Sequence, residues 1–212
     1  MKGLYLVTDR ALCGGRRLED VIRQAVQGGA AIVQLREKEL ATRPFVEEAR
    51  HIKGILKPLG VLLIINDRLD VALAAKADGV HIGQDDMPYE IARKWMGPNA
   101  IIGLSVETWG DVERAQHMDV DYLGISPVFE TPTKTDTKGA WGLAGISRIR
   151  QFSRHRLVAI GGLHADNARA IIQAGADAVA VVSAICAASD PLQASRELHT
   201  IIEQALSERQ NR

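Results

Sequence analysis

Residues 157–182 read LVAIGGLHADNARAIIQAGADAVAVV and contain one complete strand–helix–strand unit. The apolar run from Leu157 to Ile160 predicts a buried strand, and Ala165 to Ala174 has the apolar spacing of an amphipathic helix. A second apolar run, Ala178 to Val182, predicts the next strand. Continuously apolar strands that alternate with helices are typical of a parallel sheet whose outer face is covered by those helices.

The same alternation recurs along the whole chain. The other expected strands cover residues 4–7, 31–35, 61–65, 80–82, 100–104 and 122–125. The other expected helices cover residues 18–27, 44–56, 69–76, 89–95, 109–117, 143–152 and 192–206. Eight such units predict an α/β fold, a (β/α)8 TIM barrel that forms a single domain over residues 1–212. A doubly wound open sheet is the alternative, but it has edge strands, and none of these runs is polar enough for an edge.

Composition narrows the classes of function. Lys and Arg together number 26, as do Asp and Glu, so the chain has no basic field that would attract nucleic acid or a membrane surface. We therefore expect neither as a partner, and any bound anion must be held by local groups. A homo-oligomer is compatible with the sequence.

The N-terminus and the cysteines indicate a cytoplasmic protein. MKGLYLVTDR reaches polar residues too early for a signal peptide or an anchor, and no apolar run approaches the roughly 18 residues of a membrane span. Cys13 and Cys186 fit neither a disulfide framework nor a zinc motif. We expect both thiols to be structural or incidental.

Cations and an amide follow the second expected strand. In the segment Gln34-Leu35-Arg36-Glu37-Lys38, the side chains of Gln34, Arg36 and Lys38 alternate onto one side of an extended chain. The working groups of a barrel lie at the C-terminal ends of its strands, and two cations with an amide donor suit a diphosphate. The alternative is a solvated, charged turn.

Carboxylates follow the third and fourth expected strands. Asp67 comes in Asn66-Asp67-Arg68, and Asp85 and Asp86 end the phrase His81-Ile82-Gly83-Gln84-Asp85-Asp86. Two carboxylates from adjacent loops are typical of a Mg²⁺ site that is completed by phosphate oxygens and water. Each aspartate is instead a candidate cap for the helix that follows it. We expect His81 to be packed and hydrogen-bonded rather than a ligand or a base.

Small residues follow the last two strands. Gly161 and Gly162 come after the seventh strand, and Ser183 comes after the eighth. At these two positions TIM barrels commonly present main-chain N–H groups to a phosphate. Glycines that are needed only for a tight turn are the alternative. The long polar stretch PVFETPTKTDTKGAW, residues 127–141, interrupts the rhythm before the sixth helix and predicts a functional loop.

Taken in order, six phrases resemble the thiamine phosphate synthase family. They are LYLVTDR, GGAAIVQLREKE, LLIINDRLDVALAAKADGVHIGQDDMP, IIGLSVET, DYLGISPVFETPTKTD and VAIGGLHADNARAIIQAGADAVAVVSAI, and they extend from about residue 3 to about residue 187. The resemblance implies a Mg²⁺-dependent transferase of thiamine biosynthesis. Its substrates would be small phosphorylated molecules: a pyrimidine diphosphate and a thiazole phosphate that are joined with release of diphosphate.

The resemblance also implies a role for individual residues. The pyrimidine diphosphate would be held by Gln34, Leu35, Arg36, Glu37, Lys38, Asn66, Ser105 and Lys134. The thiazole phosphate would be held by Thr131, Pro132, Thr133, Gly162, Val182 and Ser183. Asp67 and Asp86 would bind Mg²⁺, which decides between Asp85 and Asp86. Arg36, Lys38 and Lys134 would stabilise the departing diphosphate.

The sequence departs from the family pattern at two positions. Ser126 stands where glycine is common, and Glu130 stands where proline is common, so substrate affinity could differ. The related thiazole tautomerases would have a histidine at the position of Glu107, which weighs against their activity here. Another phosphate-handling barrel enzyme and a noncatalytic regulatory relative are the remaining alternatives, and the regulatory one would lack the metal carboxylates or the cations.

Overall fold

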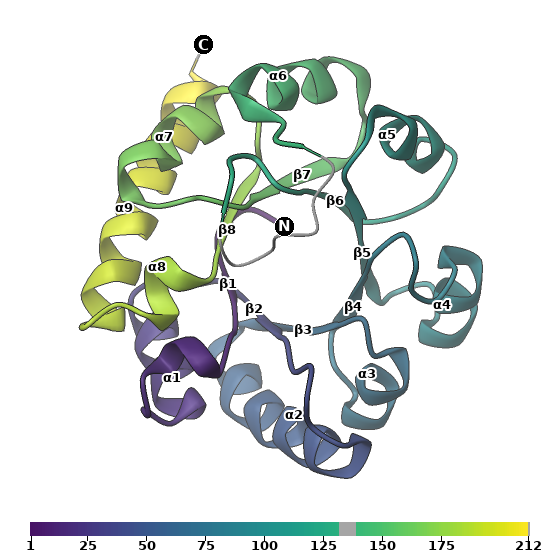
Figure 1. Ribbon diagram of the computed structural model, residues 1–212, viewed down its shortest axis with the longest axis vertical. Coiled ribbons are helices and arrows are strands. Elements are labelled where there is room, and N and C mark those ends of the chain that lie inside the picture. The colour runs from purple at the N-terminus through teal and green to yellow at the C-terminus, as the bar shows by residue number, and fades with distance from the viewer. Residues whose placement is uncertain (132–138, 212) are drawn as a thin grey trace.

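A closed barrel of eight parallel strands forms the centre of the computed structural model, which describes residues 1–131 and 139–211 (Figure 1). The strands pair in chain order, and β1 pairs with β8 to close the ring. Their bounds are β1 Gly3–Val7, β2 Ile32–Leu35, β3 Leu62–Asn66, β4 Gly79–Ile82, β5 Ile101–Val106, β6 Tyr122–Ile125, β7 Arg156–Ile160 and β8 Ala178–Val181. The predicted TIM barrel is confirmed.

Helices surround the barrel (Figure 1). They are α1 Leu18–Gln27, α2 Thr42–Leu56, α3 Leu69–Ala75, α4 Tyr89–Met96, α5 Trp109–Ala115, α6 Gly142–Phe152, α7 Ala165–Gln173, α8 Ser183–Cys186 and α9 Pro191–Gln210. Short 3-10 turns, η1 Ala11–Cys13 and η2 Lys57–Leu59, follow β1 and α2. The sequence pattern does not predict α8, η1 or η2, because such short elements show no periodicity. Across the described residues, no helix has both the length and the apolar composition that a membrane span requires.

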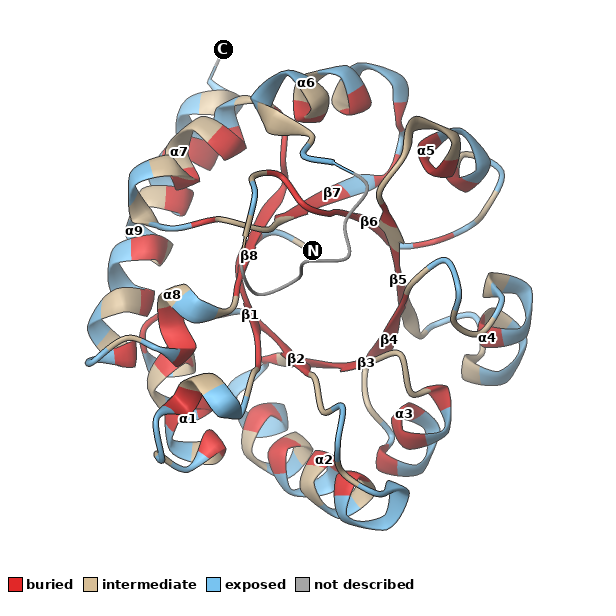
Figure 2. Ribbon diagram, viewed as in Figure 1, coloured by how far each residue is buried: buried red, intermediate tan, exposed pale blue. Residues whose placement is uncertain are grey.

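Two apolar clusters stabilise the fold. The larger lies between strands and helices, and the smaller fills the barrel. Strand β1 shows how both arise, because Leu4 and Leu6 face the helices while Tyr5 and Val7 face the interior. Figure 2 shows the result as a buried ring of strands inside helices whose outer faces are exposed.

Three aspartates join neighbouring strands at the N-terminal end of the barrel, and we call them the aspartate collar: Asp78, Asp121 and Asp177. Each comes directly before an even-numbered strand, and its carboxylate accepts a hydrogen bond from a main-chain N–H of the preceding strand. The donors are Leu63 at 2.7 Å, Ile102 at 2.8 Å and Leu157 at 3.0 Å. An aspartate directly before an even-numbered strand therefore joins that strand to the preceding one.

Candidate active site

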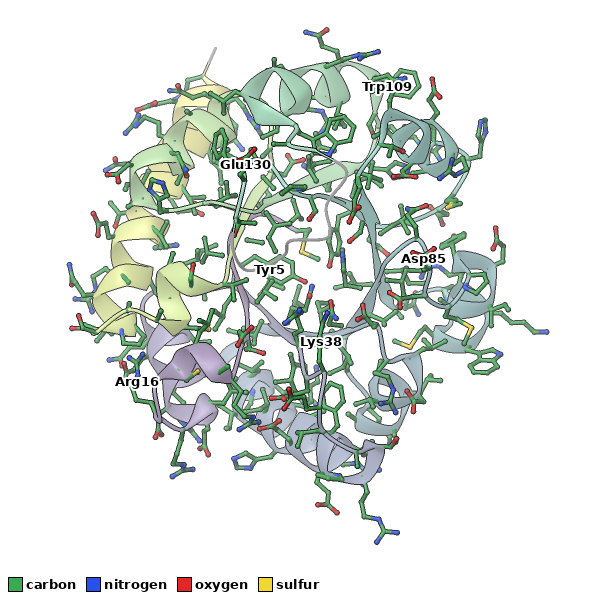
Figure 3. The ribbon with its side chains drawn as sticks, in the orientation of Figure 1. Tyr5, Arg16, Lys38, Asp85, Trp109 and Glu130 are labelled. Atoms are coloured by element: carbon green, nitrogen blue, oxygen red, sulfur yellow. The ribbon has the colours of Figure 1, made fainter. Side chains whose placement is uncertain are left out.

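A cavity of about 770 Å³ opens at the C-terminal mouth of the barrel. All eight strands or the loops that follow them contribute residues to its wall. In Figure 3 Tyr5 lies inside the ring of strands, and Lys38 lies at its edge near β2 and β3. This is the end of a TIM barrel at which chemistry is expected.

Most of the predicted site residues meet in this cavity. Its wall includes Gln34, Arg36, Lys38, Asn66, Asp67, Asp86, Ser105, Thr131, Gly162, Val182 and Ser183. Lys134, Pro132 and Thr133 lie outside the described residues. Leu35 and Glu37 lie within the described residues but do not line the cavity.

Side chains alternate between the two faces of β2 and of the extended residues that follow it, which explains why Leu35 and Glu37 are absent from the cavity wall. Leu35 is fully buried in the cluster between strands and helices. The Glu37 carboxylate forms an ion pair with Arg10 at 2.8 Å. Their side chains therefore do not line this cavity, because residues on opposite faces of an extended chain cannot enter one cavity. Their assignment to the pyrimidine diphosphate stays a prediction.

Arg36 is held in place at the cavity rim. Its main-chain N–H donates to the Thr8 hydroxyl at 3.0 Å, and its guanidinium lies 3.5 Å from the Asp9 carboxylate. Only 23% of the Arg36 side chain is exposed, so the alternative of a solvated turn does not describe it. With Lys38 it gives this wall two positive charges that point toward one space.

Asp67 and Asp86 form a carboxylate pair. Burial, and then the neighbouring Asp86 carboxylate, raise the pKa of Asp67 to about 6, while Lys38 and Arg36 act in the opposite direction. Asp86 also accepts a hydrogen bond from the main-chain N–H of Gly83 at 2.7 Å. Two carboxylates that face each other in a partly buried site favour a bound cation.

The capping hypothesis for the aspartates is wrong. Helix α3 is preceded by Arg68 and helix α4 by Pro88, and neither helix has a side-chain cap. Asp67 instead has a left-handed backbone with a φ of 60°. Strained main-chain geometry of this kind is concentrated at functional sites.

His81 is buried and hydrogen-bonded, as expected. Its Nδ1 lies 2.9 Å from the Tyr122 hydroxyl, and its Nε2 lies 2.8 Å from the Ser105 hydroxyl. Two glycines make room for the ring. A Cβ atom at Gly103 would lie 2.5 Å from His81 Nδ1, and one at Gly124 would lie 2.9 Å from His81 Cε1.

Tyr5 and Tyr122 are cavity residues that the sequence analysis missed. The Tyr5 hydroxyl lies 2.9 Å from that of Tyr122 and accepts from the Gln34 amide at 2.8 Å. Both tyrosines lie in strands that are otherwise apolar, so the composition of these strands did not indicate polar groups in the cavity. Their inward-facing register was the only available signal.

The turn after β7 shows why its glycines are needed. Gly161 and Gly162 have φ values of 102° and 67°, a region that favours glycine. A Cβ atom at Gly161 would lie 2.6 Å from Pro127 Cβ, and one at Gly162 would lie 2.9 Å from Phe129 Cβ. The tight-turn interpretation is therefore correct, and it is compatible with a phosphate at the same turn, because both glycines line the cavity.

Comparisons with known proteins place the chain in one family. Residues 4–185 match the family described as thiamine monophosphate synthase. The chain belongs to the thiamine monophosphate synthase family. A thiamine-phosphate synthase of Albidiferax ferrireducens is 55% identical over 200 residues, which cover 94% of this chain and 91% of the relative. One of Leptospira biflexa is 51% identical over 199 residues, which cover 92% of this chain and 95% of the relative.

Solved structures give the same result. A thiamine phosphate pyrophosphorylase from Pyrococcus furiosus superposes with a TM-score of 0.89 at 38% identity, and the match covers 96% of both chains. A 3-hexulose-6-phosphate synthase superposes with a TM-score of 0.68 at 18% identity, which shows only a shared fold. The likeness to the thiamine monophosphate synthase family thus extends over almost the whole barrel.

The two residues that were expected to depart from the family pattern line the cavity. Ser126 is buried, and Glu130 is exposed at the rim. Glu107, at the position where a tautomerase would have histidine, also lines it. Cys13 and Cys186 are buried and do not line the cavity, and burial raises the pKa of Cys186 to about 12. A thiolate nucleophile is therefore disfavoured.

Proposed function

We propose that this chain is a transferase that forms thiamine phosphate from a pyrimidine diphosphate and a thiazole phosphate. The observation that carries the proposal is the cavity wall in which two cations, Arg36 and Lys38, face the carboxylates Asp67 and Asp86. Such a wall suits a diphosphate together with a divalent cation. The names of the relatives support the same activity. The two buried free thiols favour a reducing, cytoplasmic location.

The carboxylate pair fits Mg²⁺. Its donors are hard oxygens, and burial together with the Asp86 carboxylate raises the pKa of Asp67, so a bound cation would stabilise the ionised pair. Among the described residues, no group of three or more His, Cys, Asp and Glu side chains converges, so diphosphate oxygens and water must complete the shell. When bound there, Mg²⁺ would neutralise part of the diphosphate charge.

The proposed reaction breaks one bond and forms one. The bond between the pyrimidine methylene carbon and the diphosphate oxygen breaks, and the diphosphate leaves with the electron pair. The thiazole nitrogen supplies the pair for the new carbon–nitrogen bond. Arg36 and Lys38 would stabilise the charge that grows on the leaving oxygen, because preformed cations act most strongly where charge develops. Lys134, beyond the described residues, is proposed for the same role.

Positioning of the nucleophile is the second task. We assign the thiazole phosphate to the loops after β7 and β8, where Gly162, Val182 and Ser183 line the wall opposite β3 and β4. Binding the two substrates on facing walls would orient the nitrogen toward the carbon. No protein nucleophile is required.

The test is incubation of the purified protein with both phosphorylated substrates, with Mg²⁺ or with EDTA, followed by chromatographic detection of thiamine phosphate. We expect product only with Mg²⁺. Asp86→Asn should lose most of this activity, whereas the matched variant Asp85→Asn, which alters an exposed neighbour in the same cavity wall, should keep it. Absence of product from the folded wild-type protein under any metal condition would refute the proposal.

A further inference from the structure

We propose that a directed chain of hydrogen bonds at the floor of the cavity turns the Ser105 hydroxyl into a donor toward the substrate. The chain runs from Gln34 through Tyr5, Tyr122 and His81 to Ser105. Tyr122 and His81 are then positioning residues that act through Ser105. The inference rests on the proposed function for the identity of the substrate, a pyrimidine diphosphate, but not for the direction of the chain.

The chain is continuous and largely buried. Its four contacts measure 2.8, 2.9, 2.9 and 2.8 Å, all within hydrogen-bond range. Tyr5 and Tyr122 are each only 1% exposed, and the His81 ring stacks on Tyr122 with centroids 5.4 Å apart. Burial of this kind makes an unsatisfied donor costly, so the hydrogens must be placed where each has an acceptor.

The first link sets the direction. The Gln34 amide nitrogen donates to the Tyr5 oxygen, so the Tyr5 hydrogen is available for the Tyr122 oxygen. Tyr122 then donates to His81 Nδ1, which must be unprotonated to accept. A neutral imidazole with a bare Nδ1 has its proton on Nε2, and this proton goes to the Ser105 oxygen.

The reverse direction leaves a buried donor unsatisfied. If Tyr122 donated to Tyr5, the Tyr5 oxygen would accept from both Tyr122 and Gln34. Its own hydrogen would then have no acceptor among the described residues. Reversal without that defect requires the Gln34 amide to turn so that its carbonyl faces Tyr5, which is opposite to the orientation observed.

The consequence falls on Ser105, which lies at the cavity wall. Among the described residues, His81 is the hydrogen-bond partner of the Ser105 hydroxyl oxygen, and in this direction it is the donor. The Ser105 hydrogen is then directed to an acceptor atom of the substrate. With the other histidine tautomer, the same hydrogen would point at His81 Nε2 and be lost to the substrate.

The surrounding backbone is built for this chain. A Cβ atom at Gly103 would lie 2.1 Å from Tyr122 Cζ, and one at Gly124 would lie 2.9 Å from His81 Cε1. The two glycines lie in adjacent strands, β5 and β6. The absence of side chains at these two positions thus leaves the space in the barrel interior that the Tyr122 and His81 rings occupy.

The first test measures the tautomer without any substrate. In ¹⁵N-labelled wild-type protein, NMR of the six histidines, with His81 assigned through His81→Gln, should show His81 neutral and protonated on Nε2. A proton on Nδ1 would overturn the proposal, whatever activity the protein has. Because no substrate is present, this result is independent of the proposed function.

The second test is a double-mutant cycle on kcat/KM for the pyrimidine diphosphate. Tyr122→Phe should reduce kcat/KM by about tenfold when Ser105 is present and by less than about twofold in the Ser105→Ala background. Tyr89→Phe, which removes a hydroxyl that accepts from the Asp119 main chain outside the cavity, is the matched control and should leave the rate unchanged. Equal losses in both backgrounds would overturn the proposal. If Tyr122→Phe does not fold, the tautomer of the wild-type protein still decides the question.

Discussion

Asp67 combines two unfavourable features at one residue. Its backbone is left-handed, and its carboxyl has a pKa of about 6 because burial and the Asp86 carboxylate disfavour the ionised form. A carboxyl whose pKa is higher in the folded than in the unfolded chain contributes stability below its unfolded pKa, and that contribution is lost as the pH rises through the folded value. The metal-free protein should therefore lose stability at this residue between about pH 4 and pH 6.

We expect Asp67→Asn to stabilise the metal-free protein at pH 8 while it removes Mg²⁺-dependent turnover. Asparagine tolerates the left-handed backbone and carries no charge, so the gain should be about 1 kcal/mol after allowance for partial exposure. That corresponds to a rise in Tm of roughly 2–4 °C. Thermal unfolding in EDTA at pH 8 and pH 4 checks this, and the difference should shrink at pH 4. An unchanged Tm at pH 8 would contradict it.

At the scale of elements, the short helix α8 links β8 to the cavity. Ser183 begins this helix and lines the cavity, whereas Cys186 ends it and is buried outside the wall. One turn of helix therefore separates a candidate phosphate contact from a packing residue. The two positions should respond to substitution in different ways.

Ser183→Ala should raise the KM for the thiazole phosphate about tenfold, since it removes one charge-assisted hydrogen bond. Cys186→Ala should leave kcat and both KM values near those of the wild type, with only a loss of stability from reduced packing. Steady-state kinetics on both variants, with circular dichroism to verify folding, checks this. A folded but inactive Cys186→Ala enzyme would show that the thiol has a catalytic role after all.

The elements also show what the sequence can predict and why. Long apolar runs predicted all eight strands, but β5 continues to Val106 rather than ending at Leu104. Its ladder with β6 still pairs Ser105 with Gly124, and a polar residue inside a strand end gives no periodic signal. The chain through Tyr5 and Tyr122 joins strands that are 117 residues apart, so it depends on barrel closure rather than on any local motif. By contrast, the order of strands predicted Asp67 and a second carboxylate at Asp85 or Asp86, and the family resemblance then decided for Asp86.

The two ends of the barrel differ in what their residues do: one end forms the cavity, and the other joins the strands to one another. The cavity lies at the C-terminal end of the strands, and the aspartate collar lies at the N-terminal end. Asp177 is the most buried collar member, at 4% exposure, and it forms ion pairs with Arg150, Arg156 and Arg209. Residues at this end should affect stability without affecting substrate binding.

Asp177→Ala should lower the free energy of unfolding by roughly 3–5 kcal/mol, because it removes the carboxylate that accepts from the Leu157 N–H and pairs with three guanidinium groups. The KM values of the folded fraction should stay unchanged. Urea unfolding measures the first effect and steady-state kinetics the second. Asp119→Ala, which alters an exposed aspartate, is the control. A large change in KM for Asp177→Ala would show that the two ends are coupled.

The aspartate collar has no member before β2, and this predicts which main-chain amides exchange their hydrogen first. Ala31 occupies the equivalent place before β2. Its main-chain N–H donates to the Leu4 carbonyl, just as the N–H of Asp78 donates to the Leu63 carbonyl. Unlike Asp78, however, Ala31 has no carboxylate that could accept a hydrogen bond from the N–H of the preceding strand. The amides of Leu63, Ile102 and Leu157 should therefore exchange only through global unfolding. The amide of Leu4 should exchange faster, through local separation of β1 from β2. The barrel would then open first between β1 and β2. Substrates bind at the C-terminal end of the strands, away from the collar, so they should slow amide exchange that requires global unfolding more than exchange through this local opening.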